Sequence, residues 1–222
     1  MLISDVMKTN VVSIPSTTTL AEARRIMDAH KISRLPIIDR MALQGIISKD
    51  DLDKVGPSQL TTFSVNEMAY MLNKITVKDV MHRDVITVSP DTVIEEAVYL
   101  AQSKKVGSVL VTQGNRVIGI ATTTDIFRHV LNPLFGIGKP GVRLCVIQCY
   151  TGPDIEKVLG AINKLNIPIV NLFITDFPEV NKHDLIIHLD AADCDHIVEA
   201  IKKLGFNVDI RSRPYLDPMA QL

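Results

Sequence analysis

Two short segments of the chain place a hydroxyl side chain three residues before an aspartate. Gly45 to Asp51 reads Gly-Ile-Ile-Ser-Lys-Asp-Asp, and Gly119 to Asp125 reads Gly-Ile-Ala-Thr-Thr-Thr-Asp. A carboxylate at such a position can accept hydrogen bonds from two neighbouring ribose hydroxyls, and the N–H groups of a helix start can hold a phosphate. Both segments therefore carry the residue types that a nucleotide site requires.

A purely structural role explains the same spacing. A Ser or Thr followed three residues later by an acid satisfies the free N–H groups at a helix N-terminus. Only the glycine indicates more, because it lets another group approach the backbone closely, which capping does not require. From these residues alone, capping is the favoured interpretation and nucleotide binding is the alternative.

Both segments belong to an internal repeat with an offset of 74 residues. Residues 3–52 align without a gap on residues 77–126, and 11 of the 50 positions are identical, including the glycines and the final aspartates. A unit of this size buries too little apolar surface to be stable alone. We therefore expect the two copies to pair as one domain.

Each copy is predicted to fold as strand, helix, strand, strand, helix. The first copy gives strands at 11–14, 35–38 and 43–47, a helix from about Leu20, and a closing helix near Ser48. The second copy gives strands at 85–88, 108–112 and 117–121 and a closing helix near Thr122. An amphipathic spacer helix is predicted between the copies, at 64–75.

The rest of the chain follows a different pattern. Asn132 to Gly141 holds three glycines and two prolines, which predicts a linker. Residues 142–212 predict the order βαββαβ, which is the ferredoxin-like arrangement. The predicted boundaries are 1–131 for the paired repeats (about 1–56 and 76–131 for the copies), 132–141 for the linker, 142–212 for the second domain and 213–222 for a tail. The predicted fold class is α+β.

Composition argues against several classes of partner. The chain has 24 Lys and Arg against 25 Asp and Glu, so it has no excess positive charge for a nucleic-acid backbone. Its apolar runs are shorter than the ~20 residues of a membrane-spanning helix, and its N-terminus shows no secretory signal. We expect no nucleic acid, no membrane partner and a cytoplasmic location. Three cysteines without a Cys-x-x-Cys pair argue against a disulfide framework and a structural zinc site.

Other signals are discounted. Gly136 to Gly141 spells Gly-x-Gly-x-x-Gly, but it follows a predicted helix and leads into a strand, which is the wrong context for a dinucleotide fingerprint. Asp193 to His196 and the pair His183 and His188 are interpreted as structural rather than as metal ligands. No grouping typical of catalysis stands out. We therefore expect no metal, no required cofactor and no enzymatic activity.

The first 130 residues or so resemble tandem CBS domains, also called a Bateman module. The resemblance rests on the repeated Asp-Val-Met start, on the run Ile-Ser-Arg-Leu-Pro-Ile at 32–37 and on the two Gly-x-x-Ser/Thr-x-x-Asp ends. In that family the paired units enclose two clefts that commonly hold adenosine ligands. The resemblance implies that Asp51 and Asp125 take the ribose and that Ser48 and Thr122 lie near phosphate.

The resemblance also implies where the adenine would lie. Such modules hold it with apolar side chains and main chain near the first strand of each unit, which here gives Thr9, Val12, Arg83 and Ile86 as candidates. Where phosphates would lie, the copies differ: the first has Lys8, Thr9, Asn10 and Lys49, and the second has His82, Arg83, Asp84 and Thr123, so unequal sites are expected. With the resemblance included, ligand binding is favoured over pure capping. The expected ligands are AMP, ADP or ATP, followed by S-adenosylmethionine or NAD.

The second domain resembles an ACT domain, through its element order and the run Ile155 to Ala161. That family often binds amino acids at its first strand-helix turn, which here comprises Thr151, Gly152, Pro153 and Asp154. The turn typically carries Pro-Gly, whereas this chain has Gly-Pro, and proline has no N–H to offer a carboxylate. We therefore expect pairing rather than amino-acid binding from this domain.

Nearly the whole chain resembles the AcuB-like proteins associated with acetoin utilisation, although no residue here points to acetoin. The resemblance implies a non-enzymatic sensor that binds an adenosine nucleotide, relays its state to the ACT-like domain or to an unidentified regulated protein, and forms a homodimer. One alternative is a ligand-free interaction scaffold or dimerisation subunit. The other is an enzyme acting on a bound nucleotide.

Overall fold

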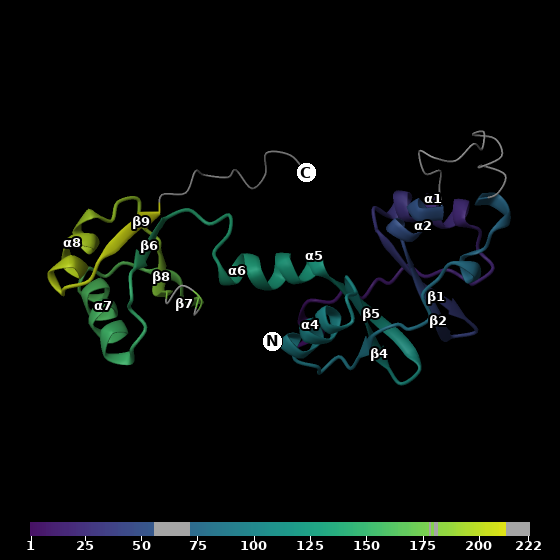
Figure 1. Ribbon diagram of the computed structural model, residues 1–222, viewed down its shortest axis with the longest axis horizontal. Coiled ribbons are helices and arrows are strands. Elements are labelled where there is room, and N and C mark those ends of the chain that lie inside the picture. Colours follow the sequence, from purple (N-terminus) through teal and green to yellow (C-terminus); the bar gives the residue numbers. More distant parts are fainter. Residues whose placement is uncertain (56–71, 178, 180–181, 212–222) are drawn as a thin grey trace. The chain divides into compact units, whose positions relative to one another are not determined.

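The computed structural model describes residues 1–55, 72–177, 179 and 182–211 (Figure 1). Contacts within the chain divide it into two units, Met1–Phe127 and Arg128–Leu222. The predicted α+β class is confirmed, because both units combine helices with small sheets. Most of the predicted spacer helix lies outside the described residues, and only residues 72–74 of it are seen as helix.

The first repeat builds one layer of helix against a two-stranded sheet. Its elements are α1 (Leu20–His30), β1 (Arg34–Asp39), β2 (Ala42–Ser48) and α2 (Lys49–Val55), and β1 pairs antiparallel with β2. The N-cap of α1 is Thr19, whose hydroxyl accepts a hydrogen bond from the backbone N–H of Glu22. The strand predicted at 11–14 is reduced to a single bridge between Ile14 and Ile37.

The second repeat has the same plan. Its elements are β3 (Thr87–Val88), α4 (Ile94–Ser103), β4 (Ser108–Gln113), β5 (Arg116–Thr122) and α5 (Thr123–Ile126), in the sheet order β3-β4-β5. The first strand is again shorter than predicted. The register of the antiparallel pair shifts between Ile37 and Ile38 in the first repeat and between Val111 and Thr112 in the second, which are equivalent positions at the 74-residue offset. The sequence repeat therefore extends to the backbone, because the same strand irregularity occurs at the same position of both copies.

The two repeats exchange their N-terminal segments. Leu2 bridges to Val93 of the second repeat, and the corresponding Thr76 bridges back to Thr19 of the first. A second pair of bridges joins Lys8 to Ile120 and His82 to Ile46. Each repeat is thus completed by the chain that precedes the other one.

Packing explains the repeated glycine. A Cβ atom on Gly45 would lie 2.6 Å from the carbonyl oxygen of His82, and one on Gly119 would overlap the sulfur of Met7. The group that needs this close approach is therefore the N-terminal segment of the opposite repeat. The sequence pattern indicated that something approaches the backbone there, and the structure identifies it as the protein's own chain.

Apolar side chains from several segments form the core of the first repeat. Leu20, Ala23 and Met27 of α1 pack with side chains of β1, β2 and α2. Val77 and Met81, which belong to the second repeat in sequence, are members of the same core. The exchange is therefore part of the hydrophobic core and not only of the backbone bridging.

The second unit contains one four-stranded antiparallel sheet. Its elements follow the predicted order: β6 (Val142–Val146), α7 (Gly152–Lys164), β7 (Ile169–Phe177), β8 (Lys182–Leu189), α8 (Asp195–Lys203) and β9 (Val208–Arg211). The strand order is β7-β8-β6-β9. Both helices pack on one face of the sheet, where they bury a core that includes Leu144, Ile187, Val158 and Ile197.

The connection between the repeats and this sheet is more ordered than a plain linker. After α5 the chain forms a π-helical turn (Phe127–Leu131) and the short helix α6 (Asn132–Leu134). The ring centroids of Phe135 and Phe173 then lie 4.9 Å apart, and the carbonyl oxygen of Pro140 lies 2.8 Å from Nε2 of His188. The glycine-rich run is therefore packed against the sheet of its own unit.

Candidate functional site

Asp51 and Asp125 close their helix ends in the same way. Oδ2 of Asp51 accepts hydrogen bonds from the backbone N–H and the hydroxyl of Ser48, at 2.9 and 2.5 Å. Oδ2 of Asp125 does the same with Thr122, at 2.9 and 2.6 Å. The capping function is therefore present in both copies.

Capping alone does not account for the burial of these carboxylates. Asp51 is 7% exposed and Asp125 is 1% exposed, whereas aspartates are rarely buried unless they are paired. The pairing comes through the second oxygen of each. Oδ1 of Asp51 lies 3.0 Å from Nε2 of His82, and Oδ1 of Asp125 lies 3.0 Å from Nζ of Lys8.

Lys8 and His82 occupy equivalent positions of the two repeats. Each reaches the aspartate of the opposite repeat, because the exchanged N-terminal segments run beside β5 and β2. Lys8 and His82 are among the residues expected near phosphates, but their contacts with the two aspartates were not predicted from the sequence. The signal available for them was the 74-residue offset, which aligns a lysine with a histidine one position after each Asp-Val-Met start.

Both carboxylates are held in their ionised form. Burial alone would raise the pKa of Asp51, but hydrogen bonds from Ser48 and His82 outweigh it and hold that pKa below its ordinary value. Burial would likewise raise the pKa of Asp125, and hydrogen bonds from Thr122 and Lys8 again lower it. Each site therefore presents a buried negative charge.

A cleft of about 510 Å³ opens beside Asp51. We call it the first cleft. Its lining combines the end of the first repeat with two segments of the second, namely Arg34, Ile46, Ser48, Asp50, Asp51, Lys54, residues 82–86 and residues 104–108. Four predicted site residues, Ser48, Asp51, Arg83 and Ile86, are thus brought together in one place.

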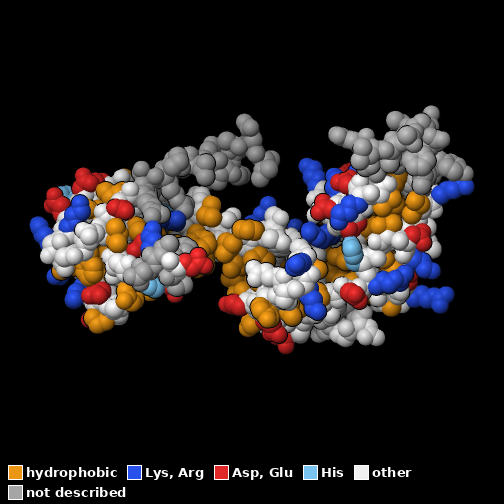
Figure 2. Space-filling model, in the orientation of Figure 1, with side chains coloured by type: hydrophobic (Ala, Val, Ile, Leu, Met, Phe, Trp, Pro, Cys, Tyr) orange, Lys and Arg blue, Asp and Glu red, His pale blue; other side chains and the backbone are white. Residues whose placement is uncertain are grey.

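The first cleft has a cationic rim around its buried carboxylate. Arg34, Lys54, Arg83, Lys104 and Lys105 outnumber the three aspartates of the lining. Such a lining suits an anionic ligand whose polar, uncharged part faces an aspartate. The contributions of Arg34 and of residues 104–108 were not anticipated from the sequence. Over the visible faces of the units as a whole, acidic and basic side chains are interspersed (Figure 2).

The other predicted nucleotide-site residues lie elsewhere. Nζ of Lys49 lies 2.8 Å from Oδ1 of Asp28, and Lys49 is not among the residues that line the first cleft. Thr9 is exposed and Val12 packs against the core of the first repeat. These two residues correspond by the repeat offset to Arg83 and Ile86. We call the region around Thr122 and Asp125 the second site.

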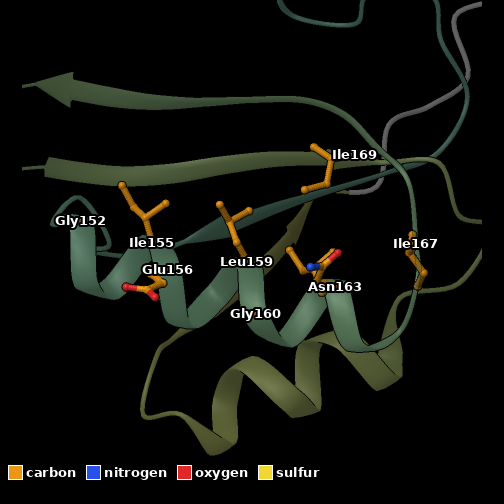
Figure 3. Close-up of a pocket in the computed structure, with 9 residues that line it drawn as sticks. Gly152, Ile155, Glu156, Leu159, Gly160, Asn163, Ile167 and Ile169 are labelled. Carbon is orange, nitrogen blue, oxygen red and sulfur yellow. The ribbon is translucent and has the colours of Figure 1, made fainter.

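The predicted turn of the second unit forms a helix cap. The hydroxyl of Thr151 donates to Asp154 at 2.7 Å and accepts from the backbone N–H of Asp154. Gly152 lines one end of a groove of about 600 Å³ along α7. Ile155 and Leu159 point from α7 toward the strands, and Ile169 also lines the groove (Figure 3). Among the described residues that line this groove, the only charged one is Glu156, so the lining offers no cation to a carboxylate.

Two findings concern metal ions and membranes. Within the described residues, no group of three or more His, Cys, Asp or Glu side chains is arranged to hold a metal ion. His183 instead pairs with Asp176, at 3.0 Å between Nδ1 and Oδ1. None of the helices in the described part of the chain is long and apolar enough to cross a membrane.

The two repeats exchange their N-terminal segments, and each has a buried aspartate in its closing helix. This arrangement is that of a paired-domain module. The family model for the CBS domain matches residues 3–57 and 77–132, which together make up half of the chain. The chain therefore belongs to the CBS-domain family, and the resemblance seen in the sequence is confirmed.

Several solved structures and curated proteins are similar to parts of this chain. A crystal structure of a putative acetoin utilization protein (AcuB) from Vibrio cholerae is 27% identical, with a TM-score of 0.50 over 60% of this chain and 91% of that one. The CBS domain pair of protein MJ0100, in complex with 5′-methylthioadenosine and S-adenosyl-L-methionine, is 30% identical and covers 61% of this chain and 96% of that one, at a TM-score of 0.49. An inosine-5′-monophosphate dehydrogenase from Korarchaeum cryptofilum is 28% identical over 80% of this chain. The present chain spans only 33% of that enzyme's length.

Proposed function

We propose that this protein is a non-enzymatic sensor that binds an adenosine-containing ligand, AMP, ADP or ATP, at the sites of its CBS pair. The observation that carries the proposal is the first cleft, in which a buried, ionised Asp51 lies inside a cationic rim. A ribose offers neighbouring hydroxyl donors to the carboxylate, and a phosphate offers negative charge to the rim. A nucleotide combines both in one molecule.

The state of the CBS pair is proposed to pass to the ACT-like unit or to a regulated partner. A ligand can do this only if it binds two arrangements of the protein unequally. The CBS-domain match over residues 3–57 and 77–132 supports a regulatory role. Pairing with a second copy is part of the same proposal.

A panel of adenosine compounds tests the proposal by thermal shift. A ligand present at 100 times its dissociation constant should stabilise the fold by about 2.7 kcal/mol. We expect AMP, ADP or ATP to raise the melting temperature and GMP to serve as the base-specificity control. A folded protein whose melting temperature does not respond to any adenosine compound contradicts the proposal.

A second candidate function is an interaction scaffold without a ligand. The observation that favours it is that both carboxylates already accept protein hydrogen bonds, two from the cap and one from a side chain of the opposite repeat. The same panel separates the two candidates. An enzyme acting on the nucleotide is tested by incubating ATP with the protein and assaying products, and we expect no turnover.

A further inference from the structure

The contacts of the two buried aspartates leave little room for a ribose. A carboxylate has about four acceptor positions. In Asp125 the cap takes two of them on Oδ2, and Nζ of Lys8 takes one on Oδ1 at 3.0 Å. A pair of ribose hydroxyls needs two positions, so the arrangement as it stands can accept only one hydroxyl.

Of the three contacts of Asp125, the one with Lys8 is the easiest to displace. The cap hydrogen bonds of Asp125 join groups three residues apart on one helix turn, whereas Lys8 comes from the opposite repeat and its side chain is 54% exposed. Lysine carries its charge on a flexible stem with rotatable donors, so it can turn to a new partner nearby. A ligand phosphate bound beside the ribose would be such a partner.

On the basis of the proposed function, we propose that Lys8 is an internal counter-ion that competes with ribose for Asp125 and then transfers to the ligand phosphate. His82 makes the corresponding contact with Asp51 in the first cleft. An unphosphorylated nucleoside must displace the cation and gives it no new partner. A nucleotide displaces it and pairs it again. The counter-ion therefore selects for phosphorylated ligands.

The two sites are expected to differ in how strongly the basic residue favours a nucleotide over a nucleoside. Lysine keeps its charge over the physiological range, whereas a histidine carries one only when it is protonated. In the first cleft Asp51 also has a second basic neighbour, because Nζ of Lys54 lies 4.0 Å from its Oδ1 on a side chain that is 78% exposed. The effect of a single basic residue is therefore harder to isolate in that cleft. We therefore expect the second site to discriminate more sharply between nucleoside and nucleotide, and the counter-ion role of Lys8 is best tested there.

The test is calorimetric titration with adenosine and with AMP. It uses the full chain carrying Asp51→Ala, so that only the second site reports. Removing the charge by Lys8→Met is expected to tighten adenosine binding by about two- to fivefold and to weaken AMP binding by about two- to fivefold, as for an exposed ion pair. Lys8→Arg keeps the charge and should keep the preference for AMP.

Two further variants control the test. Lys157→Met removes a comparably exposed lysine, which pairs with Asp154 at 3.2 Å in the second unit, and should change neither affinity. Lys8→Gln retains a neutral donor for Asp125 and should also weaken AMP, which keeps the test decisive if Lys8→Met does not fold. Circular dichroism establishes folding in each case.

Opposite changes for the two ligands support the counter-ion role. Changes of equal size and direction, or no change in a folded Lys8 variant, overturn it while leaving nucleotide binding intact. If the unmodified chain binds AMP but the chain carrying only Asp51→Ala binds neither ligand, the second site takes no nucleotide and this inference is overturned. If the unmodified chain binds none of adenosine, AMP, ADP and ATP, the proposed function is wrong and this inference falls with it.

Discussion

At the scale of the residue, Asp51 and Asp125 each serve the fold and the proposed site at once. One oxygen of each carboxylate closes a helix end and the other meets a basic side chain from the opposite repeat. We therefore expect the charge of both carboxylates to stabilise the fold even without a ligand. This dual use explains why neither a capping role nor a binding role could be chosen from the spacing alone.

Acid should remove the contribution of these carboxylates to stability. Because the folded protein holds the pKa of Asp125 below its ordinary value of 3.8, the stabilisation is present above that value and is lost as pH falls through the folded pKa. Replacing Asp125 by Asn keeps the shape of the cap without the charge. Melting curves from pH 7 down to pH 3 should show the stability difference between parent and variant shrinking, and a difference that grows on acidification would contradict the pKa direction.

At the scale of the element, the close passage of the exchanged segments explains both glycines. Gly45→Ala would place its Cβ 2.6 Å from a backbone oxygen of His82, which cannot move as a side-chain tip can. We expect a loss of about 1–3 kcal/mol in the unfolding free energy of the first unit. Denaturant unfolding followed by circular dichroism measures it.

Gly160→Ala is the matched control for this change. Gly160 lies in α7, and a Cβ there would meet no atom within 4 Å. Alanine favours a helix interior over glycine by up to about 1 kcal/mol, so this variant should be unaffected or slightly stabilised. Equal destabilisation by both substitutions would show that loss of glycine, rather than the contact with His82, is responsible.

Local patterns predict much of the element order but not the contacts between repeats. The antiparallel strand pairs and closing helices follow from apolar periodicity and caps, which act within a few residues. The segments at 11–14 and 85–88 have strand-like composition, yet they form little ladder, because strand pairing depends on neighbours that composition does not specify. The Lys8 and His82 contacts depend on exchange between the copies, which periodicity within one copy does not report.

At the scale of the whole molecule, the exchange makes the CBS pair a single folding unit. Val77 and Met81 follow the first repeat in sequence but belong to its core. A fragment of residues 1–75 lacks both side chains, whereas a fragment of residues 1–131 contains them. We expect the shorter fragment to be largely unfolded and the longer one to be folded by circular dichroism, and a cooperative thermal transition in the shorter one would contradict this dependence.

Membership of the CBS-domain family and the two sites of the pair give the molecule its proposed role. In that role, Asp51 and Asp125 are proposed to bind the ribose of an adenosine ligand in addition to capping their helices. Asn substitutions separate these functions best, because an amide oxygen can still accept the cap hydrogen bonds while the negative charge is removed.

Ribose binding by Asp51 and Asp125 is tested by calorimetric titration of AMP into the full chain and into its Asp51→Asn and Asp125→Asn variants. We predict that the parent binds AMP and that each substitution weakens binding at its own site by about 1.5–3 kcal/mol, or roughly ten- to a hundredfold. Folded variants that bind AMP as tightly as the parent at both sites would contradict the account.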